Sequence, residues 1–143
     1  MRILAIGDVV GNIGCRFLRQ RLPALKKLKG VDLVIANGEN SADGNGVTPI
    51  SADFLFSSGV DVITTGNHSF RRREIYPYYD DAPYILRPAN FPEKTTPGNG
   101  TLIYDMGRVQ VCVINLMGCV FLENLKDPYE TVSYTHLRAH ETL

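Results

Sequence analysis

The chain has 143 residues and a mass of 15.9 kDa, which suits one domain or part of a larger one. Lys and Arg number 15, as do Asp and Glu, so the formal net charge is zero, and this balance argues against a general nucleic-acid-binding surface. No apolar run approaches the roughly 20 residues of a membrane span, so we expect no membrane partner.

Three short apolar runs rich in β-branched residues predict buried parallel strands. The runs cover residues 2–6, 31–36 and 60–65. Between the first two runs, apolar side chains recur at helical spacing and predict a helix with an apolar face formed by Phe17, Leu18, Leu22, Leu25 and Leu28. Pro23 is expected to kink or split this helix, because it has no N–H to donate.

A second helix is predicted after the second run, with signals at both of its ends. Thr48 suits the N-cap and Pro49 the first helical position, while Gly59 suits the C-terminal cap. The apolar face of this helix is expected to hold Ile50, Phe54 and Leu55. After the third run, residues 71–76 are predicted to form a short helix that Pro77 ends.

The alternation of strands and helices predicts an α/β fold. Strand–helix–strand order implies right-handed crossovers and an open, mostly parallel sheet. Residues 84–86 indicate a further strand, and residues 101–104 and 109–114 predict a hairpin. Between them, Arg87 and Asn90 lie in a turn-rich segment and are expected to have structural roles.

Polar side chains follow each of the three predicted strands at the point where the strand ends. These candidate site residues are Asp8, Glu39, Asn40, Asn67 and His68. Because ligands bind at the carboxyl ends of parallel strands, we expect the five side chains to converge on one edge. Carboxylate and amide oxygens bind hard divalent cations, and an imidazole binds a metal or transfers a proton. Each residue alone is typical of a turn or a helix cap, but their occurrence at three successive strand ends indicates a site.

Four motifs carry a resemblance to a known family. They are Gly-Asp-Val-Val-Gly at 7–11, Asn-Gly-Glu-Asn at 37–40, Gly-Asn-His at 66–68 and Arg-Pro-Ala-Asn-Phe-Pro at 87–92. In order and spacing this set resembles the calcineurin-like metallophosphoesterases, in particular the YmdB-like phosphodiesterases of cyclic nucleotides. The resemblance implies an αββα sandwich, two β-sheets between helices, of which this chain would hold the N-terminal βαβ half plus a β-hairpin.

The same resemblance implies a role for each candidate site residue. Asp8 and Glu39 would bind metal, with Glu39 bridging two ions, and Asn40 and Asn67 would complete part of the shell. His68 would be the catalytic general acid for the leaving alkoxide. The expected ions are iron or manganese, which would stabilise the attacking and leaving oxygens. The implied partner is a small phosphodiester or cyclic nucleotide substrate.

The resemblance covers about half of a family chain. Residues 1–131 are assigned to the N-terminal part of a metallophosphoesterase domain. Residues 132–143 are interpreted as a non-native or disordered tail. His136 and His140 are four residues apart in this tail, and we do not expect them to supply metal ligands.

The resemblance implies a second half with several metal-binding histidines, which we expect to lie outside this chain. Asp8 and Glu39 bring two negative charges, whereas two divalent ions carry four positive charges. We therefore expect weak binding of a single ion and little or no phosphodiesterase activity from the chain alone. An unpaired sheet edge is also expected to favour aggregation or a homo-oligomer.

Two alternatives to a hydrolase remain open. Gly7, Gly11 and Gly14 follow a strand and precede a helix, as in a nucleotide-binding α/β module, although their spacing is not that of the dinucleotide fingerprint. The second alternative is a non-catalytic fragment. The arginines at 71–73 follow His68 closely and either contact a substrate phosphate or form a solvated basic face.

The cysteines indicate a cellular compartment. The chain has three cysteines, Cys15, Cys112 and Cys119. An odd number without the spacing of a metal site is typical of reduced thiols in a cytoplasmic protein. Met1 leads directly into a strand-like run that lacks the basic and apolar regions of a signal peptide, so we expect none. Cys15 lies at a predicted helix start and is interpreted as an inert packing thiol.

Overall fold

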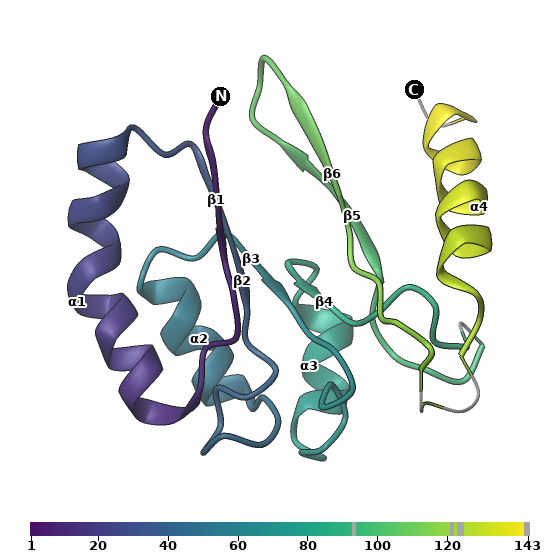
Figure 1. Cartoon of the computed structure of the whole chain (residues 1–143), viewed down its shortest axis with the longest axis horizontal. Helices are drawn as coiled ribbons and strands as arrows, with labels where there is room; N and C mark the ends of the chain where they lie inside the picture. The colour runs from purple at the N-terminus through teal and green to yellow at the C-terminus, as the bar shows by residue number, and fades with distance from the viewer. Residues whose placement is uncertain (93, 121, 123–124, 142–143) are drawn as a thin grey trace.

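The computed structural model describes residues 1–92, 94–120, 122 and 125–141, and for residues 136–141 only the backbone. The elements are, in chain order, β1 (Ile3–Ile6), α1 (Gly11–Lys29), β2 (Leu33–Asn37), α2 (Pro49–Ser57), β3 (Val62–Thr64), α3 (Ile75–Asp81), β4 (Ile85–Leu86), β5 (Thr101–Asp105), β6 (Gln110–Ile114) and α4 (Pro128–Glu141). Figure 1 shows α1 and α2 on one side of the sheet β1–β4, the β5–β6 hairpin on the other, and α4 beyond the hairpin. None of the helices in these described ranges combines the length and apolar character that a membrane crossing needs.

The predicted parallel sheet is present, and its strands lie in chain order. β1, β2, β3 and β4 are neighbours in that order, and each neighbouring pair is parallel. The register pairs Ile6 with Ala36 and Asn37 with Thr64, so the first three strands end at one edge of the sheet. Each crossover passes through one helix on the same face, as right-handed βαβ units require when the strand order advances in one direction.

Two apolar clusters hold the layers together. One face of the sheet packs against the three helices, and Leu22 of α1, Leu55 of α2 and Tyr79 of α3 are fully buried there. The opposite face packs against the hairpin through a cluster of Leu33, Val62, Leu86 and Val113. Side chains alternate between the two faces along each strand, so the central strands are apolar throughout. The layers confirm the α/β fold and the half-sandwich that the family resemblance implies.

The local signals at the ends of α2 are confirmed. Thr48 Oγ1 accepts a hydrogen bond from Ser51 N at 3.2 Å, and Ser51 Oγ accepts one from Thr48 N at 3.0 Å, a capping box. Gly59 follows the C-cap with φ of 105°, a left-handed value that glycine favours. The prediction for Ile50 is wrong, because its side chain is 83% exposed. Ile50 precedes the buried Leu55 by five residues, which places it roughly 140° away around the helix.

The predicted first helix is corrected in two respects. α1 runs unbroken from Gly11 to Lys29 with Pro23 inside it, so this proline does not split the helix. Leu22 carries the buried side, whereas Phe17 and Leu28 are 61% and 78% exposed. Phe17 and Leu28 lie five and six residues from Leu22, roughly 120–140° around the helix. The sheet covers only one stripe of this helix and leaves them in solvent.

The predicted position of the third helix is wrong. Residues 71–74 form bends and turns, and α3 covers Ile75–Asp81 with Pro77 in its first turn. The first N–H groups of a helix have no partner within the helix, so a proline sacrifices no bond there. Pro77 therefore lies near the start of the helix that it was predicted to end.

The structural roles of Arg87 and Asn90 are confirmed. Asn90 Nδ2 donates to the carbonyl oxygens of Met117 at 2.7 Å and Lys126 at 3.2 Å, and its Oδ1 accepts from Met117 N at 3.0 Å. The Arg87 guanidinium is buried, and its Nη1 donates to Pro88 O at 2.9 Å. Both side chains tie the segment after β4 to neighbouring backbone.

The remaining predicted strands are present, and the last described segment is a helix. β5 and β6 form the expected antiparallel hairpin. α4 begins at Pro128, and Asp127 Oδ1 accepts from the backbone N–H of Tyr129 at 2.8 Å and of Glu130 at 3.1 Å. The backbone is helical to residue 141, and the assignment of 132–143 as a non-native or disordered tail stays a prediction.

Candidate active site at the ends of the parallel strands

The candidate site lies where β1, β2 and β3 end, and backbone hydrogen bonds join the three loops that follow. Val9 N donates to Asn37 O at 2.9 Å, which links the first loop to the end of β2. Gly38 N donates to Thr64 O at 3.0 Å, which links the second loop to the end of β3. The loops are therefore held side by side at one edge of the sheet, as the order of the strands predicts.

Asn40 joins the first loop to the third. Its Nδ2 donates to both carboxylate oxygens of Asp8, at 3.1 Å for Oδ1 and 2.8 Å for Oδ2. Its Oδ1 lies 2.5 Å from Nδ1 of His68. Asp8 is exposed, whereas Asn40 and His68 are half-buried. Three side chains from three different loops thus form one hydrogen-bonded chain.

This chain determines where the hydrogen lies on the His68 ring. A carboxylate only accepts hydrogen bonds, so Asn40 presents its NH₂ group to Asp8 and its oxygen to His68. An amide oxygen also only accepts, so Nδ1 of His68 carries a hydrogen and donates it. Nε2 is then the ring atom that can take or give a proton outside the chain.

Glu39 is held by residues of two loops. Its Oε2 accepts from the backbone N–H of His68 at 3.1 Å, and its Oε1 accepts from Asn37 Nδ2 at 3.3 Å. A Cβ at Gly66 would lie 2.7 Å from each of the two carboxylate oxygens. The absence of a side chain at position 66 is therefore what allows the carboxylate to rest against the third loop.

Asn67 lies in the third loop between Gly66 and His68, but its side chain is not joined to the others. It is exposed and forms no hydrogen bond with the part of the chain that the structure describes. The structure therefore brings Asp8, Glu39 and the two residues of the Asn40–His68 pair together and leaves the Asn67 amide in solvent.

A cluster of buried hydroxyl groups supports the third loop from below. Thr65 Oγ1 lies 2.7 Å from Ser69 Oγ and 3.0 Å from Tyr79 OH, and it donates to Leu86 O at 2.9 Å. Burial raises the pKa of Tyr79 to about 12, and its hydrogen bonds to Thr65 and Ser69 act in the opposite direction. The cluster fastens both ends of the short segment that carries His68.

Two asparagines that position the site were not among the predicted site residues. Asn37 donates to Glu39 from the end of β2, and in the sequence it stands out only as the first residue of the Asn-Gly-Glu-Asn motif. Asn115 Nδ2 donates to the carbonyl oxygens of Thr65 at 2.7 Å and Leu86 at 3.0 Å, which links the hairpin to the end of β3. Asn115 directly follows a predicted strand, the same signal that pointed to the other site residues.

The three arginines at 71–73 differ in their environments. Arg72 Nε donates to Asn45 O at 2.9 Å, and its Nη2 lies 3.9 Å from Asp43 Oδ2. Arg71 and Arg73 are exposed. Arg72 thus has a structural role in holding the second loop, whereas the other two form a solvated basic surface.

Two of the three glycines that suggested a nucleotide-binding loop, Gly11 and Gly14, use their N–H groups within the chain. Gly11 N donates to Asn40 O at 2.9 Å, and Gly14 N donates to Val10 O at 3.1 Å. A phosphate-binding loop needs such groups directed at the ligand. This arrangement disfavours the alternative of a nucleotide-binding module.

The donor set fits a divalent cation in part. Asp8 and Glu39 offer carboxylate oxygens and Asn67 an amide oxygen at one edge of the sheet, all of them hard donors. Across the described side chains, no group of three or more His, Cys, Asp and Glu lies close enough together to hold a metal ion. The side chains of His136 and His140 lie outside the described part of the chain. The residues present could therefore supply only part of a coordination shell.

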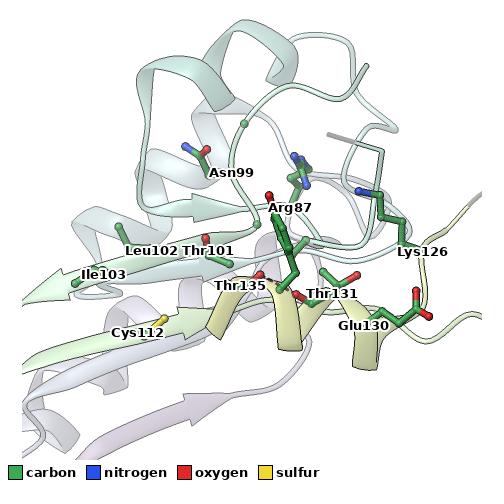
Figure 2. Close-up of a pocket in the computed structure, with 14 residues that line it drawn as sticks. Arg87, Asn99, Thr101, Leu102, Ile103, Cys112, Lys126, Glu130, Thr131 and Thr135 are labelled. Carbon is green, nitrogen blue, oxygen red and sulfur yellow. Dashed lines mark hydrogen bonds between the residues drawn. The ribbon is translucent and has the colours of Figure 1, made fainter. Parts of the chain in front are cut away.

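The candidate site is distinct from a large cavity elsewhere in the molecule. This cavity, of about 960 Å³, lies between the hairpin and α4. Figure 2 shows hairpin and α4 side chains on its walls, among them Thr101, Ile103, Cys112, Glu130, Thr131 and Thr135. None of the candidate site residues lines it, so the candidate site is an open edge of the sheet rather than a wall of this cavity.

Comparisons with known proteins agree on one family. The family model described as YmdB-like protein matches residues 4–142. A 2′,3′-cyclic-nucleotide 2′-phosphodiesterase of Bacillus subtilis (strain 168) is 45% identical over 129 residues, which cover 90% of this chain and 48% of that protein. A hypothetical protein from Thermus thermophilus matches with a TM-score of 0.87 and 36% identity, over 94% of this chain and 52% of that chain. A novel phosphatase from Mycoplasma pneumoniae matches with a TM-score of 0.87 and 28% identity, over 95% and 50%. The chain thus spans about half the length of these relatives.

Proposed function

The chain belongs to the YmdB-like protein family, and we propose on that basis that it carries part of the active site of a metal-dependent phosphodiesterase. The proposed substrates are small phosphodiesters of the cyclic-nucleotide type, the class that appears in the name of the Bacillus subtilis relative. The name of the Mycoplasma pneumoniae phosphatase also supports phosphoester hydrolysis as the reaction class.

One observation supports this proposal most strongly. Hydrogen bonds connect Asp8 through Asn40 to His68, and the backbone of His68 donates to Glu39. Two carboxylates and an imidazole are thereby held together at the end of three strands. Turn or cap roles for the separate residues would not need these contacts between loops.

Asp8, Glu39, Asn40 and Asn67 are the residues that would hold iron or manganese. A bound divalent ion supplies positive charge that polarises phosphoryl oxygens. In this chain Asn40 fixes the orientation of the Asp8 carboxylate, and the N–H of His68 fixes that of Glu39. The two carboxylates are therefore already oriented in the absence of a ligand.

His68 is the proposed general acid. Its Nδ1 hydrogen is used in the bond to Asn40, so Nε2 would deliver the proton to the leaving alkoxide. Asn40 fixes the plane of the imidazole ring. The buried hydroxyl cluster of Thr65, Ser69 and Tyr79 fixes the backbone that carries His68. Asn40 and Thr65 are therefore positioning residues, which would act on the reaction only through His68.

We propose further that the chain alone binds a single ion weakly and hydrolyses little phosphodiester. Two carboxylates are too few for two divalent ions, and the described side chains include no group of three or more His, Cys, Asp and Glu that could hold a metal ion. The remaining ligands would come from the part of the family protein that this chain does not match.

The test joins residues 1–131 to the Bacillus subtilis relative, in place of the part of that protein that they match. We expect the purified chimera to hydrolyse a bis-aryl phosphate and a 2′,3′-cyclic nucleotide in the presence of manganese. His68→Asn should lower kcat by about 10²- to 10⁴-fold, the usual contribution of a general acid. Arg73→Gln, a change at a nearby exposed residue, serves as the control and should leave kcat unchanged.

Two results would contradict the proposal. One is a folded chimera that binds manganese but hydrolyses no phosphodiester. The other is a chimera whose turnover is the same with asparagine at position 68. The full chain of 143 residues is assayed in parallel, and tight binding of two ions with full turnover by this chain alone would refute the proposed weak site.

We also propose a cytoplasmic location. The free thiols of Cys15, Cys112 and Cys119 support a reducing compartment. Cys15 is buried, and burial raises the pKa of its thiol, which supports its interpretation as an inert packing residue.

A further inference from the structure

The outer face of α1 carries exposed apolar side chains. Figure 1 shows α1 as the outermost element on its side of the sheet. Ile13, Phe17 and Leu28 are 79%, 61% and 78% exposed. Ala24, between Phe17 and Leu28, is exposed as well. The four positions 13, 17, 24 and 28 follow one another at intervals of four, seven and four residues, which places their side chains on one face of the helix. We call Ile13, Phe17, Ala24 and Leu28 the apolar stripe of α1.

Positive charge flanks the apolar stripe. α1 contains six Lys and Arg residues and no Asp or Glu. Two of the six turn inward, since Arg19 lies 3.5 Å over the ring of Phe54 and Lys26 Nζ lies 3.3 Å from Asp61 Oδ2. The other four are exposed and form no ion pair with the residues that the structure describes; they are Arg16, Arg21, Lys27 and Lys29.

The exposed cations lie on both sides of the apolar stripe. Helical spacing places Arg21 along one side, four residues after Phe17, and Arg16 and Lys27 along the other. Near the end of the helix, Asp32 accepts a hydrogen bond from the backbone of Arg2 and is not paired with an α1 side chain. The face therefore presents an apolar centre with Arg21 on one side and with Arg16 and Lys27 on the other.

We propose that this face of α1 docks on an anionic lipid surface. A helix that lies in a membrane interface inserts its apolar side chains between lipid headgroups, and its Lys and Arg side chains contact the anionic groups. The cytoplasmic leaflet is negatively charged and attracts clusters of basic residues. The apolar stripe of α1 and its flanking cations have this arrangement. The proposal departs from the expectation of no membrane partner, which rested only on the absence of an apolar run long enough to span a bilayer.

Two other occupants fit the face less well. A second copy of the chain would bring the same cations of the two helices together, and like charges repel. A nucleic acid would pair with the cations but would leave Phe17 and Leu28 against a sugar–phosphate backbone. The inference is independent of the proposed phosphodiesterase function, because it concerns a different face and no site residue.

The test is co-sedimentation of the full chain with vesicles. We expect binding to vesicles of phosphatidylglycerol mixed with phosphatidylcholine, and much weaker binding to vesicles of phosphatidylcholine alone. The double variant Ile13→Ser/Phe17→Ser should lower the partition coefficient about tenfold by removing inserted apolar groups, and Arg16→Gln/Lys27→Gln should lower it by a similar factor. The control Val109→Ser changes an exposed apolar residue on the hairpin and should have no effect. Circular dichroism shows that each variant is folded.

Several outcomes would overturn the proposal. These are no sedimentation with anionic vesicles, equal binding to neutral vesicles, and wild-type binding by either double variant while folded. A dimer that light scattering detects and that Phe17→Ser abolishes would also contradict the proposal. So would binding of a single-stranded oligonucleotide by a chain that does not bind vesicles. Either would assign the face to a different occupant.

Discussion

At the scale of single residues, Asn40 is the centre of the candidate site. Its amide group contacts Asp8 through nitrogen and His68 through oxygen, and its carbonyl accepts the N–H of Gly11. No other asparagine of the site has partners in both neighbouring loops, among the described residues. Asn67, by contrast, is exposed and has no hydrogen bond there.

The contrast between the two asparagines gives a matched pair of variants. Asn40→Asp removes the NH₂ donor and places a third carboxylate beside Asp8 and Glu39. We expect it to lower the free energy of unfolding by about 1–3 kcal/mol at neutral pH, measured by urea denaturation. Asn67→Asp should change it by less than about 0.5 kcal/mol. Equal effects of the two substitutions would show that Asn40 does not link the loops.

Tyr79 is expected to make the unfolding free energy depend on pH in the alkaline range. The folded-state pKa of Tyr79, about 12, lies above the ordinary value of 10, so the folded state favours the protonated phenol. The unfolded chain loses this proton first, and the stabilisation is complete below pH 10 and lost as the pH rises through 12. Tyr79→Phe should therefore flatten the fall in unfolding free energy between pH 10 and 12. It should also cost about 1 kcal/mol at neutral pH through the lost hydrogen bond.

The control for this pH effect is Tyr129→Phe, which changes an 82% exposed tyrosine. It should keep the wild-type dependence of the unfolding free energy on pH. A Tyr79→Phe variant with the wild-type slope would contradict the assignment of the raised pKa to Tyr79.

At the scale of elements, the hairpin is joined to the parallel sheet by a close backbone contact. A Cβ at Gly100 would lie 2.2 Å from Ala89 Cα. Asn115 N donates to Gly100 O at 2.9 Å, and Ala89 N donates to Asn115 O at 2.7 Å. The lack of a side chain at Gly100 therefore allows the β5–β6 hairpin to approach the segment after β4 this closely.

Gly100→Ala tests this contact. Because the clash is with backbone, we expect the variant to lose about 3 kcal/mol of stability or to fail to fold, as measured by thermal and urea unfolding. Gly118→Ala is the control, since a Cβ there meets nothing within 4 Å. A Gly100→Ala variant as stable as Gly118→Ala would mean that the two segments do not approach as described.

Local signals explain which elements were predicted correctly. Strands, the hairpin and the cap of α2 depend on neighbours in sequence, such as Thr48 with Ser51, and these predictions are confirmed. The orientation of α1 was wrong for Phe17 and Leu28, because the side of a helix that faces the sheet is decided by tertiary packing. The position of α3 was wrong because Pro77 is compatible with both the end and the first turn of a helix.

The candidate site was predictable in part for a similar reason. The positions of Asp8, Glu39 and His68 follow from three strand ends and the parallel order of the strands. The partner of each side chain does not follow from the sequence: the roles of Asn37 and Asn115 depend on which loops lie side by side. That proximity appears only when the register of the sheet is known.

At the scale of the whole molecule, the parallel sheet has an unpaired edge. β1 has a neighbour only in β2 among the described strands, and Ile3 is 46% exposed on it. An apolar edge strand is a template for pairing with another chain. We propose that the protein self-associates through β1 at high concentration.

Ile3→Lys tests self-association. A lysine on an edge strand opposes pairing with a second edge, so we expect a shift from dimers or larger species to monomers in light scattering across a concentration series. Ile50→Lys introduces the same charge at an 83% exposed position of α2 and should leave association unchanged. A wild-type chain that stays monomeric at every concentration would contradict this prediction.

We propose that Asp8, Glu39, Asn40 and Asn67 hold a divalent cation beside His68, and Mn²⁺ can map this binding site directly. In an NMR titration of the isotopically labelled chain, a paramagnetic ion broadens the amide signals nearest to it. We expect the signals of residues 8, 39–40 and 67–68 to broaden first, and Asp8→Asn to abolish this selectivity. Sharp signals at these positions while others broaden would contradict the account.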